Sequence, residues 1–337
     1  MGKYRFLLSI FVALSHIGTY FAGINQGVVS VVSFLLISGF TMQKSADKFF
    51  REEVVRGRQI INFYFDRIMR IYPQYIFFCV LTVIYVYFFS IPDELNECMR
   101  TMNFRYFIKN LLIFPVGSRK GLDTMIIPAA WTLALEFKFY LLYPFIYKYK
   151  LQKISLLLSG AVFTLAFVGK IDTAWFGYKS ILGMLFIFMT GCILGSKEFL
   201  RDKKWVLGVW SISIFFIVRY LMKLEYHLGF NREIILGLIL GIPMILFLKD
   251  DKMTRLDHLL GSLSYGIYLN HYQIKYVMRM QPINLGDRLV FFSISIVLAL
   301  VAYVLIEKPL TTIRRDIRER QQKEIRRNME GNGGCIR

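Results

Sequence analysis

The sequence is poor in acidic residues and in cysteine. Its 337 residues include 23 Asp plus Glu against 42 Lys plus Arg, so the formal net charge at pH 7 is +19. Only four cysteines occur: Cys79 and Cys192 lie inside apolar runs, and Cys98 and Cys335 lie far apart. Neither a disulfide framework nor a CxxC metal site is therefore available, and we expect no bound metal. An internal repeat, a glycine-rich phosphate loop and a separate soluble domain are also missing.

Apolar side chains, by contrast, make up 55% of the chain, and aromatic residues make up 16%. Together with a mean hydropathy of +0.47, this composition excludes a soluble globular protein. The basic residues lie mostly between long apolar runs, so they indicate a membrane surface as partner and not a nucleic acid. We therefore expect the lipid bilayer as the main partner.

Ten segments have the roughly 20 mostly apolar residues that a transmembrane helix needs. They are residues 5–23, 24–42, 71–91, 128–147, 154–169, 174–196, 205–222, 228–248, 258–278 and 289–306. The predicted fold class is an all-α integral membrane protein, a bundle of about ten transmembrane helices. Residues 104–116 are apolar but short and contain Arg105 and Lys109, which favours an interfacial or re-entrant piece. A signal peptide is the alternative for the first segment, but His16 interrupts it and no small-x-small cleavage site follows.

The distribution of basic residues predicts the orientation of these spans. With the N-terminus in the cytoplasm, the inner segments (1–5, 44–70, 148–153, 197–204, 249–255 and 308–337) hold 28 Lys plus Arg, whereas the outer side holds 13. The positive-inside rule then places both termini in the cytoplasm. We expect a transmembrane domain over residues 1–310 and a basic cytoplasmic tail over 311–337, in which a surface helix is attracted to anionic lipid headgroups.

Titratable residues inside the predicted spans are the first candidates for function. Such groups are costly at membrane depth, and they usually face a bundle interior or an aqueous cavity. At ~1.5 Å of rise per residue, His16, Glu136 and His271 stand ~16, ~18 and ~20 Å from the cytoplasmic edge, which predicts one common level. Arg5 and His16 are eleven residues apart and share a helix face. Tyr268 and His271, three residues apart, also share a face.

Structural roles are open for the same residues. Either histidine could form a hydrogen bond across helices without further function. Glu136 could pair with Lys138 or with a cation of another span. Arg67 and Arg70 precede the third span on the cytoplasmic side and could act as interfacial anchors. Glu307 could stabilise the end of the tenth span.

Six short motifs occur in order along the spans. They are Arg5-x10-His16 within RFLLSIFVALSH, ISGF at residues 37–40, DRIMRIYPQY with Arg67, Arg70 and Pro73, AAWTLALEFKFYLLYP with Trp131, Glu136, Tyr140 and Pro144, GSLSYGIYLNHY with Ser264, Tyr265, Tyr268 and His271, and IEKP with Glu307 and Pro309. From Arg5 to Pro309 the chain resembles the bacterial membrane-bound acyltransferase-3 family, which O-acylates cell-surface polysaccharides and related glycans. Family members often carry an Asp where Val32 stands here, so we assign no carboxylate to the second span. The chain looks like the form without a hydrolase-like extension.

The resemblance implies an O-acyltransferase of the bacterial inner (plasma) membrane. It would transfer an acyl group, commonly acetyl from acetyl-CoA, to a hydroxyl of a glycan or lipid-linked sugar, with His16 as the catalytic residue. A neutral His16 could remove the hydroxyl proton as general base, and Glu136 could orient its imidazole. Arg5, Arg67 and Arg70 fall at the cytoplasmic edge, where guanidinium groups can bind the phosphates of acyl-CoA. Acyl-CoA is thus expected as a donor substrate, with no permanently bound cofactor.

The acceptor or channel is expected to involve five further residues: Ser38, Gly39, Trp131, Tyr268 and His271. For Gly39 two accounts are open, because the missing side chain allows close approach either of the donor or of a packed helix. The alternative function is a transporter or exporter that uses the midplane His and Glu residues as a proton relay. The paired, broken spans and the internal repeat typical of such carriers are not found in the sequence.

Overall fold

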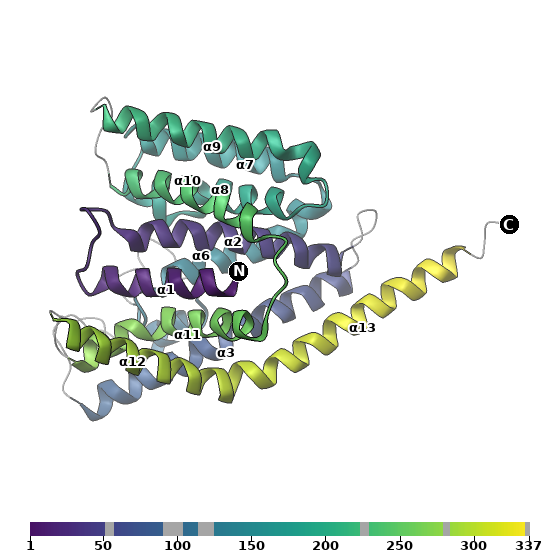
Figure 1. The fold of residues 1–337 in the computed structure, drawn as a ribbon. Coiled ribbons are helices and arrows are strands. Elements are labelled where there is room, and N and C mark those ends of the chain that lie inside the picture. The colour runs from purple at the N-terminus through teal and green to yellow at the C-terminus, as the bar shows by residue number, and fades with distance from the viewer. Residues whose placement is uncertain (51–56, 90–103, 114–124, 223–228, 279–283, 334–337) are drawn as a thin grey trace.

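The computed structural model describes residues 1–50, 57–89, 104–113, 125–222, 229–278 and 284–333, and these residues form helices (Figure 1). The described part contains no strand, only an isolated bridge between Phe21 and Ile24. In chain order the elements are α1 (Gly2–His16), α2 (Gln26–Phe49), α3 (Gly57–Phe88), α5 (Phe104–Leu111), α6 (Ala130–Lys148), α7 (Gln152–Phe167), the π-helix η3 (Trp175–Lys179), α8 (Ile181–Gly195), α9 (Phe199–Leu221), α10 (Asn231–Leu248), α11 (Arg255–Met278), α12 (Leu285–Ala302), the π-helix η4 (Tyr303–Glu307) and α13 (Lys308–Gly333). The predicted all-α fold class is confirmed.

Helix α2 is the centre of the bundle. It packs against α1, α8 and α10, and α11 joins the bundle through α1. In its most apolar stretch 83% of the residues of α2 are buried, whereas the corresponding stretch of α9 is only 11% buried. Because the outer helices expose large apolar side chains such as Leu200, Phe215 and Leu221, their outward faces suit a hydrocarbon environment.

Glycines allow α2 and α8 to approach closely. A Cβ atom on Gly39 would lie 2.0 Å from the carbonyl oxygen of Phe188, and one on Gly191 would lie 2.1 Å from that of Leu36. Small residues at such crossings let helix backbones meet in membrane proteins, where van der Waals packing drives association. The geometry therefore favours the packing account of Gly39 over contact with a ligand.

Six described helices are long and apolar enough to cross a membrane. They are α2, α3, η3 with α8, α9, α10, and the continuous helix from α12 through η4 into the start of α13. The other four predicted spans also form helices, but α1 and α7 have 15 and 16 residues, and α6 and α11 carry many polar residues. The structure thus supports a multi-pass membrane protein, with six candidate spans in its described part where the sequence predicts ten.

Several predicted boundaries are wrong: α2 ends at Phe49 instead of residue 42, α9 begins at Phe199 instead of residue 205, and the first and third spans differ in the same way. The first helix ends at His16 instead of residue 23, because the chain turns at Gly18, whose φ of 77° suits glycine. The third begins at Gly57 instead of residue 71 and continues through Pro73, which membrane helices tolerate. The predicted interfacial piece at 104–116 is helical over Phe104–Leu111, and its last residues lie outside the described part of the chain.

Candidate active site

A cleft of about 610 Å³ opens at one end of the bundle, where α1 and α11 begin and α2 and α10 end. Its walls come from α1, α2, α3, α6, α11 and the start of α13. Along α11 the lining runs from Asp257 to Tyr268, which corresponds to a depth of ~16 Å at the rise of an α-helix. The volume falls within the usual range for small-molecule sites, roughly 300 to 1,000 Å³.

Positive charge dominates the lining of this cleft. The cationic side chains are Arg5, Lys44, Lys48, Arg67, Arg70, Lys249, Arg314 and Arg318, and the acidic ones are Glu136, Asp251, Asp257 and Glu307. The amino group of Met1 and the carboxylate of Asp257 are 3.5 Å apart, so one acid is used by the chain terminus. A cleft with such an excess of cations attracts anions and raises their local concentration.

The three arginines predicted for phosphate binding all line the cleft. Arg67 is buried and donates from Nη2 to Asp66 and to Ser45, each at 2.6 Å. Arg5 and Arg70 are half-buried, and neither forms a side-chain hydrogen bond or an ion pair within 4 Å with another described residue. Two arginine side chains that face a cleft without such partners are well placed to bind an anionic ligand.

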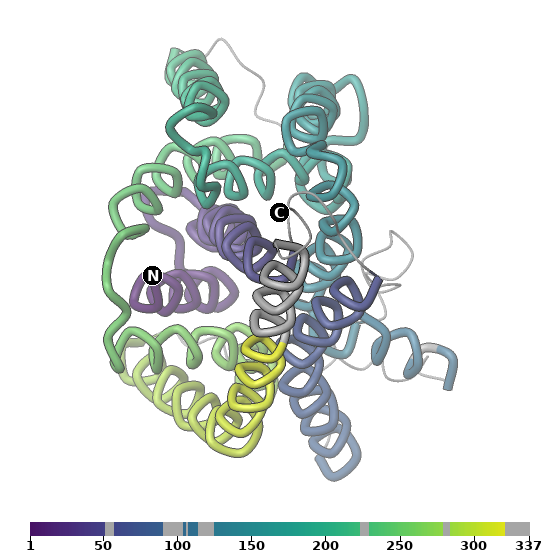
Figure 2. Tube along the Cα trace, turned by 90° about the vertical axis from the view of Figure 1, so that its right-hand side faces the viewer, coloured from purple at the N-terminus to yellow at the C-terminus, as the bar shows by residue number. Residues whose placement is uncertain are grey.

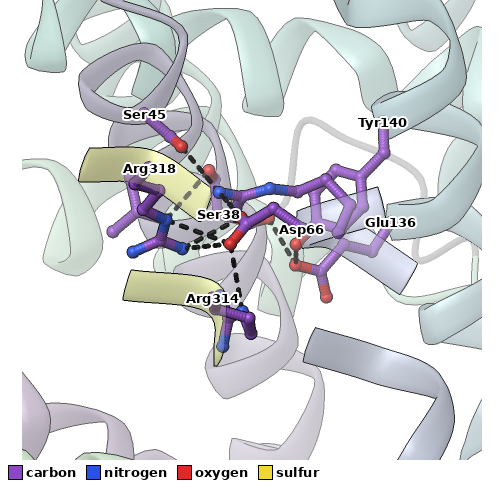
Figure 3. A network of polar contacts seen from close by, with 9 residues as sticks. Ser38, Ser45, Asp66, Glu136, Tyr140, Arg314 and Arg318 are labelled. Carbon is purple, nitrogen blue, oxygen red and sulfur yellow. Dashed lines mark hydrogen bonds and ion pairs between the residues drawn. The ribbon is translucent and has the colours of Figure 1, made fainter. Parts of the chain in front are cut away.

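Glu136 lies on the wall of the same cleft, on α6. Its Oε1 accepts hydrogen bonds from Ser38 Oγ of α2, at 2.8 Å, and from the hydroxyl of Tyr140 (Figure 3). The predicted contact between Glu136 and the His16 imidazole is absent from the described residues, because these two hydroxyl groups hold the carboxylate elsewhere. Ser38 also lines the cleft.

The two histidines of the predicted spans, His16 and His271, lie together, outside the cleft lining. The rings of His16 and His271 stack with centroids 5.1 Å apart. Tyr272 is the hydrogen-bonding partner of His16, with 2.8 Å between its hydroxyl oxygen and Nδ1. His271 is 1% exposed, its Nδ1 lies 3.3 Å from the Ile267 carbonyl oxygen, and its Nε2 is buried without a partner among the described residues.

Three side chains separate the histidine pair from the cleft. Phe34, Thr132 and Tyr268 line its inner end, where the hydroxyl groups of Thr132 and Tyr268 are 2.5 Å apart and the Phe34 ring meets the Tyr268 ring edge-on at 5.9 Å. The rings of Tyr268 and His271 are 6.0 Å apart. One helical turn of α11 therefore lies between the end of the cleft and the histidines.

The prediction of one common level is correct for the histidines and wrong for Glu136. Glu136 follows Thr132 by four residues on α6, whereas His271 follows Tyr268 by three on α11, and the two helices run in opposite directions. By helical rise the carboxylate thus lies ~10 Å nearer to the cleft mouth than His271. The prediction for Glu136 fails because it measures depth along α6 and α11 from predicted span ends, and these ends do not lie at the same two levels in the structure.

Three of the predicted acceptor or channel residues, Gly39, Trp131 and His271, do not line the cleft. Gly39 packs against the backbone of α8. Trp131 makes an edge-on contact with Tyr178, with ring centroids 4.7 Å apart. Glu307, for which a structural role was open, lines the cleft and also accepts a hydrogen bond from Gln74 Nε2 at 3.1 Å.

Several residues of this region were missed from the sequence: Thr132, Tyr272, Asp66, Arg314 and Arg318. Tyr272 continues the polar face of α11 one turn beyond Tyr268, so the same helical spacing could have found it. Arg314 and Arg318 are four residues apart, a spacing that places both on one helix face. Local spacing could not reveal the contacts of Asp66 with α13 or of Thr132 with Tyr268, because these partners lie on other helices.

The comparisons with known proteins bear directly on this arrangement. Residues 4–307 match the acyltransferase domain that defines the acyltransferase-3 family. The chain belongs to this family. The resemblance carried by the six motifs is thereby confirmed, and the match includes the cleft walls formed by α1, α2, α3, α6 and α11 but ends before α13.

Relatives of this acyltransferase-3 protein include bacterial O-acetyltransferases. It is 23% identical over 334 residues to the O-acetyltransferase OatA of Staphylococcus aureus, with 85% of this chain and 53% of that protein covered. The values for the peptidoglycan O-acetyltransferase OatA of Listeria monocytogenes are 26%, 86% and 52%. An uncharacterised protein of Aquifex aeolicus is 30% identical over 53% of this chain and 84% of its own length. The chain thus spans about half the length of the O-acetyltransferases it matches, and no solved structure matches it significantly.

The position where family members often carry an Asp has an apolar role in this acyltransferase-3 protein. Val32 is fully buried. Its Cβ atom lies close to Gly237 of α10, where an added Cβ would come within 2.6 Å. Val32 belongs to the apolar core, where an unpaired carboxylate would be costly, and this agrees with the absence of an acid at this position of α2.

Proposed function

We propose that this protein is a multi-pass membrane O-acetyltransferase that takes the acetyl group from acetyl-CoA and transfers it to a hydroxyl group of a cell-envelope glycan, such as peptidoglycan or a lipid-linked sugar. The observation that carries the proposal is a cationic cleft whose inner end lies one helical turn from a stacked pair of intramembrane histidines. The family match and the O-acetyltransferase relatives support acyl transfer as the reaction class.

The cleft suits a long donor with one anionic end. The phosphates of acetyl-CoA would bind near the mouth, where arginine and lysine side chains gather. The extended pantetheine arm would then reach toward Tyr268 and place the thioester at the inner end. Arg5 and Arg70 supply guanidinium groups on this path that form no hydrogen bond or close ion pair with another described side chain.

His16 is the proposed general base. If Nδ1 carries a proton and donates it in a hydrogen bond to the Tyr272 hydroxyl oxygen, Nε2 holds a lone pair and accepts the proton of the acceptor hydroxyl. The hydroxyl oxygen then forms a bond to the thioester carbonyl carbon, the C–S bond breaks, and the proton is returned to the departing thiolate. Because Tyr268 and Thr132 separate the cleft from His16, transfer requires the Tyr268 side chain to move aside.

Glu136 has a different proposed role from the one that its sequence position indicated. Its carboxylate is held by Ser38 and Tyr140 on the cleft wall, ahead of the inner end. A fixed acceptor at this place can receive an amide N–H of the pantetheine arm and position the thioester. We therefore propose Glu136 as a positioning residue for the donor.

Incubation of purified protein with acetyl-labelled acetyl-CoA and a lipid-linked glycan tests the function and its donor site together. We expect label in the glycan, and we expect Arg5→Ala to weaken coenzyme A binding more than Arg5→Lys, because lysine keeps the charge but loses the forked geometry. Binding is measured by calorimetry in detergent. Counterflow of label across vesicles without covalent transfer would instead indicate a carrier, and equal affinity of wild type and Arg5→Ala would remove Arg5 from the site.

In the proposed topology the chain crosses the bacterial inner membrane ten times, and both termini and the cleft mouth face the cytoplasm. The excess of basic residues on that side supports it. Single cysteines at Lys170 and Lys252, two exposed positions, test it in a background with Cys98→Ser and Cys335→Ser. We expect an impermeant maleimide to label position 170 in intact cells and position 252 only after permeabilisation. The reverse pattern would show that the orientation is wrong.

A further inference from the structure

The start of α13 is joined to the cleft wall by one buried carboxylate. Asp66 of α3 is 0% exposed and lies between the guanidinium groups of Arg314 and Arg318 (Figure 3). Arg314 donates from Nε at 3.1 Å, and Arg318 donates from Nε at 3.0 Å and from Nη2 at 2.9 Å. Figure 2 shows the yellow start of α13 beside α3, with which it is in contact.

This cluster holds more positive charge than its carboxylate neutralises. Arg67 also donates to Asp66, so three guanidinium groups share one acid, and the Nε of Arg67 is buried without a partner among the described residues. Arg314 contacts Asp66 only through Nε, which leaves its terminal amino groups without a hydrogen bond to a described residue. Three cations around one carboxylate retain an excess of two charges. A second anion at this place would compensate that excess.

The two arginines of α13 point toward the same cleft as the family motifs. Both line it, and their side chains are only 12% and 32% exposed, whereas their neighbour Arg315 is 66% exposed and lies 3.8 Å from Asp316 and from Glu319. The family match ends at residue 307. The cleft is thus completed by a segment that lies outside the matched domain.

We propose that Arg314 and Arg318 bind a phosphate group of the acyl donor, so that the first turns of α13 form part of the donor site. Asp66 positions the two guanidinium groups and leaves donor groups directed at the cleft. Arginine suits this role because its planar fork binds phosphate oxygens in pairs. The inference rests on the proposed function, since it takes the anion to be a phosphate of coenzyme A. An anionic lipid headgroup offers the same chemistry and is separated from it by the experiment below.

The test compares coenzyme A binding to wild type, to the double variant Arg314→Gln with Arg318→Gln, and to the matched control Arg315→Gln, all in neutral detergent. Loss of two charge-assisted hydrogen-bonding groups is expected to weaken binding at least about tenfold, and the control should change it less than about twofold. Equal affinity of the double variant and wild type for coenzyme A would overturn the proposal.

Two further measurements cover the remaining outcomes. The double variant leaves Asp66 with Arg67 as its remaining ion-pair partner in this cluster, so its unfolding temperature is measured beside that of wild type. The variant Arg314→Lys with Arg318→Lys keeps both charges beside Asp66 but loses the paired donors; it should unfold near the wild-type temperature and still bind coenzyme A more weakly than wild type. If wild type binds no coenzyme A, the donor of the proposed function is wrong. Phosphatidylglycerol micelles and pyrophosphate then serve as probes. If wild type binds one of them and the double variant does not, a lipid headgroup or a free phosphate occupies this site. If wild type binds neither probe, the phosphate site itself is overturned.

Discussion

Replacing His16 with alanine is expected to lower acetyl transfer by about 10² to 10⁴-fold, the usual contribution of a general base. His16 forms the last residue of α1, stacks on His271 and is bound to the Tyr272 hydroxyl. These contacts fix the ring and leave Nε2 without a hydrogen bond to a described residue. Transfer from labelled acetyl-CoA to the glycan measures the effect, under conditions in which both substrates are saturating.

The same variant should leave the donor cleft unchanged. His16 does not line it, and Tyr268 with Thr132 closes the end that faces the histidines. We therefore expect His16→Ala to bind coenzyme A with wild-type affinity and to unfold at a similar temperature, which separates lost catalysis from lost folding. A well-folded His16→Ala protein that transfers acetyl at nearly the wild-type rate would exclude His16 as the base.

His271 and Tyr272 serve as internal comparisons for this result. If His271 mainly positions the acceptor, His271→Ala should raise the acceptor concentration needed for half-maximal rate more than it lowers the maximal rate. Tyr272→Phe removes the hydroxyl that fixes the His16 ring and should have a smaller effect than His16→Ala. An inactive His271→Ala protein beside an active His16→Ala protein would move the base to α11.

Much of the cleft lining could be predicted from the sequence. Arg5, Arg67, Arg70, Glu136 and Tyr268 belong to four separate motifs, and all five residues line one cleft. The prediction works for these residues because each lies on the face of its helix that points to the cleft. In a mostly apolar helix only this polar face can accommodate a charged group. The all-α fold could also be predicted, from the long apolar runs, because backbone groups in hydrocarbon must form their hydrogen bonds within a segment.

The separation of the site into two levels could not be predicted in this way. It depends on where each helix begins and ends, and these points are set by local events such as the turn at Gly18. It also depends on contacts between residues far apart in the chain, such as the one that joins Thr132 to Tyr268 across 136 positions. Asp66 and Arg318 are 252 positions apart. From its own sequence the tail therefore predicts only a surface helix, and its contact with α3 requires the folded structure.

Replacing Gly39 with alanine is expected to destabilise the fold by at least about 3 kcal/mol, the upper range for overpacking of a core. The added Cβ would lie 2.0 Å from the Phe188 carbonyl oxygen and 3.1 Å from the backbone nitrogen of Cys192. Because both neighbours are backbone atoms of α8, no side chain can rotate away. The two helices would have to separate, and the hydrogen bond from Cys192 Sγ to the Gly39 carbonyl oxygen would be lost.

Gly160→Ala and Gly208→Ala are the matched controls for this variant. Both glycines lie inside helices, α7 and α9, and a Cβ at either position meets nothing within 4 Å. Since alanine favours the helix by about 1 kcal/mol over glycine, these variants should be at least as stable as wild type. Thermal unfolding in detergent and the monodisperse fraction on size-exclusion chromatography provide the measurement. A Gly39→Ala protein that is stable but no longer binds coenzyme A would contradict the packing account and place Gly39 at the donor.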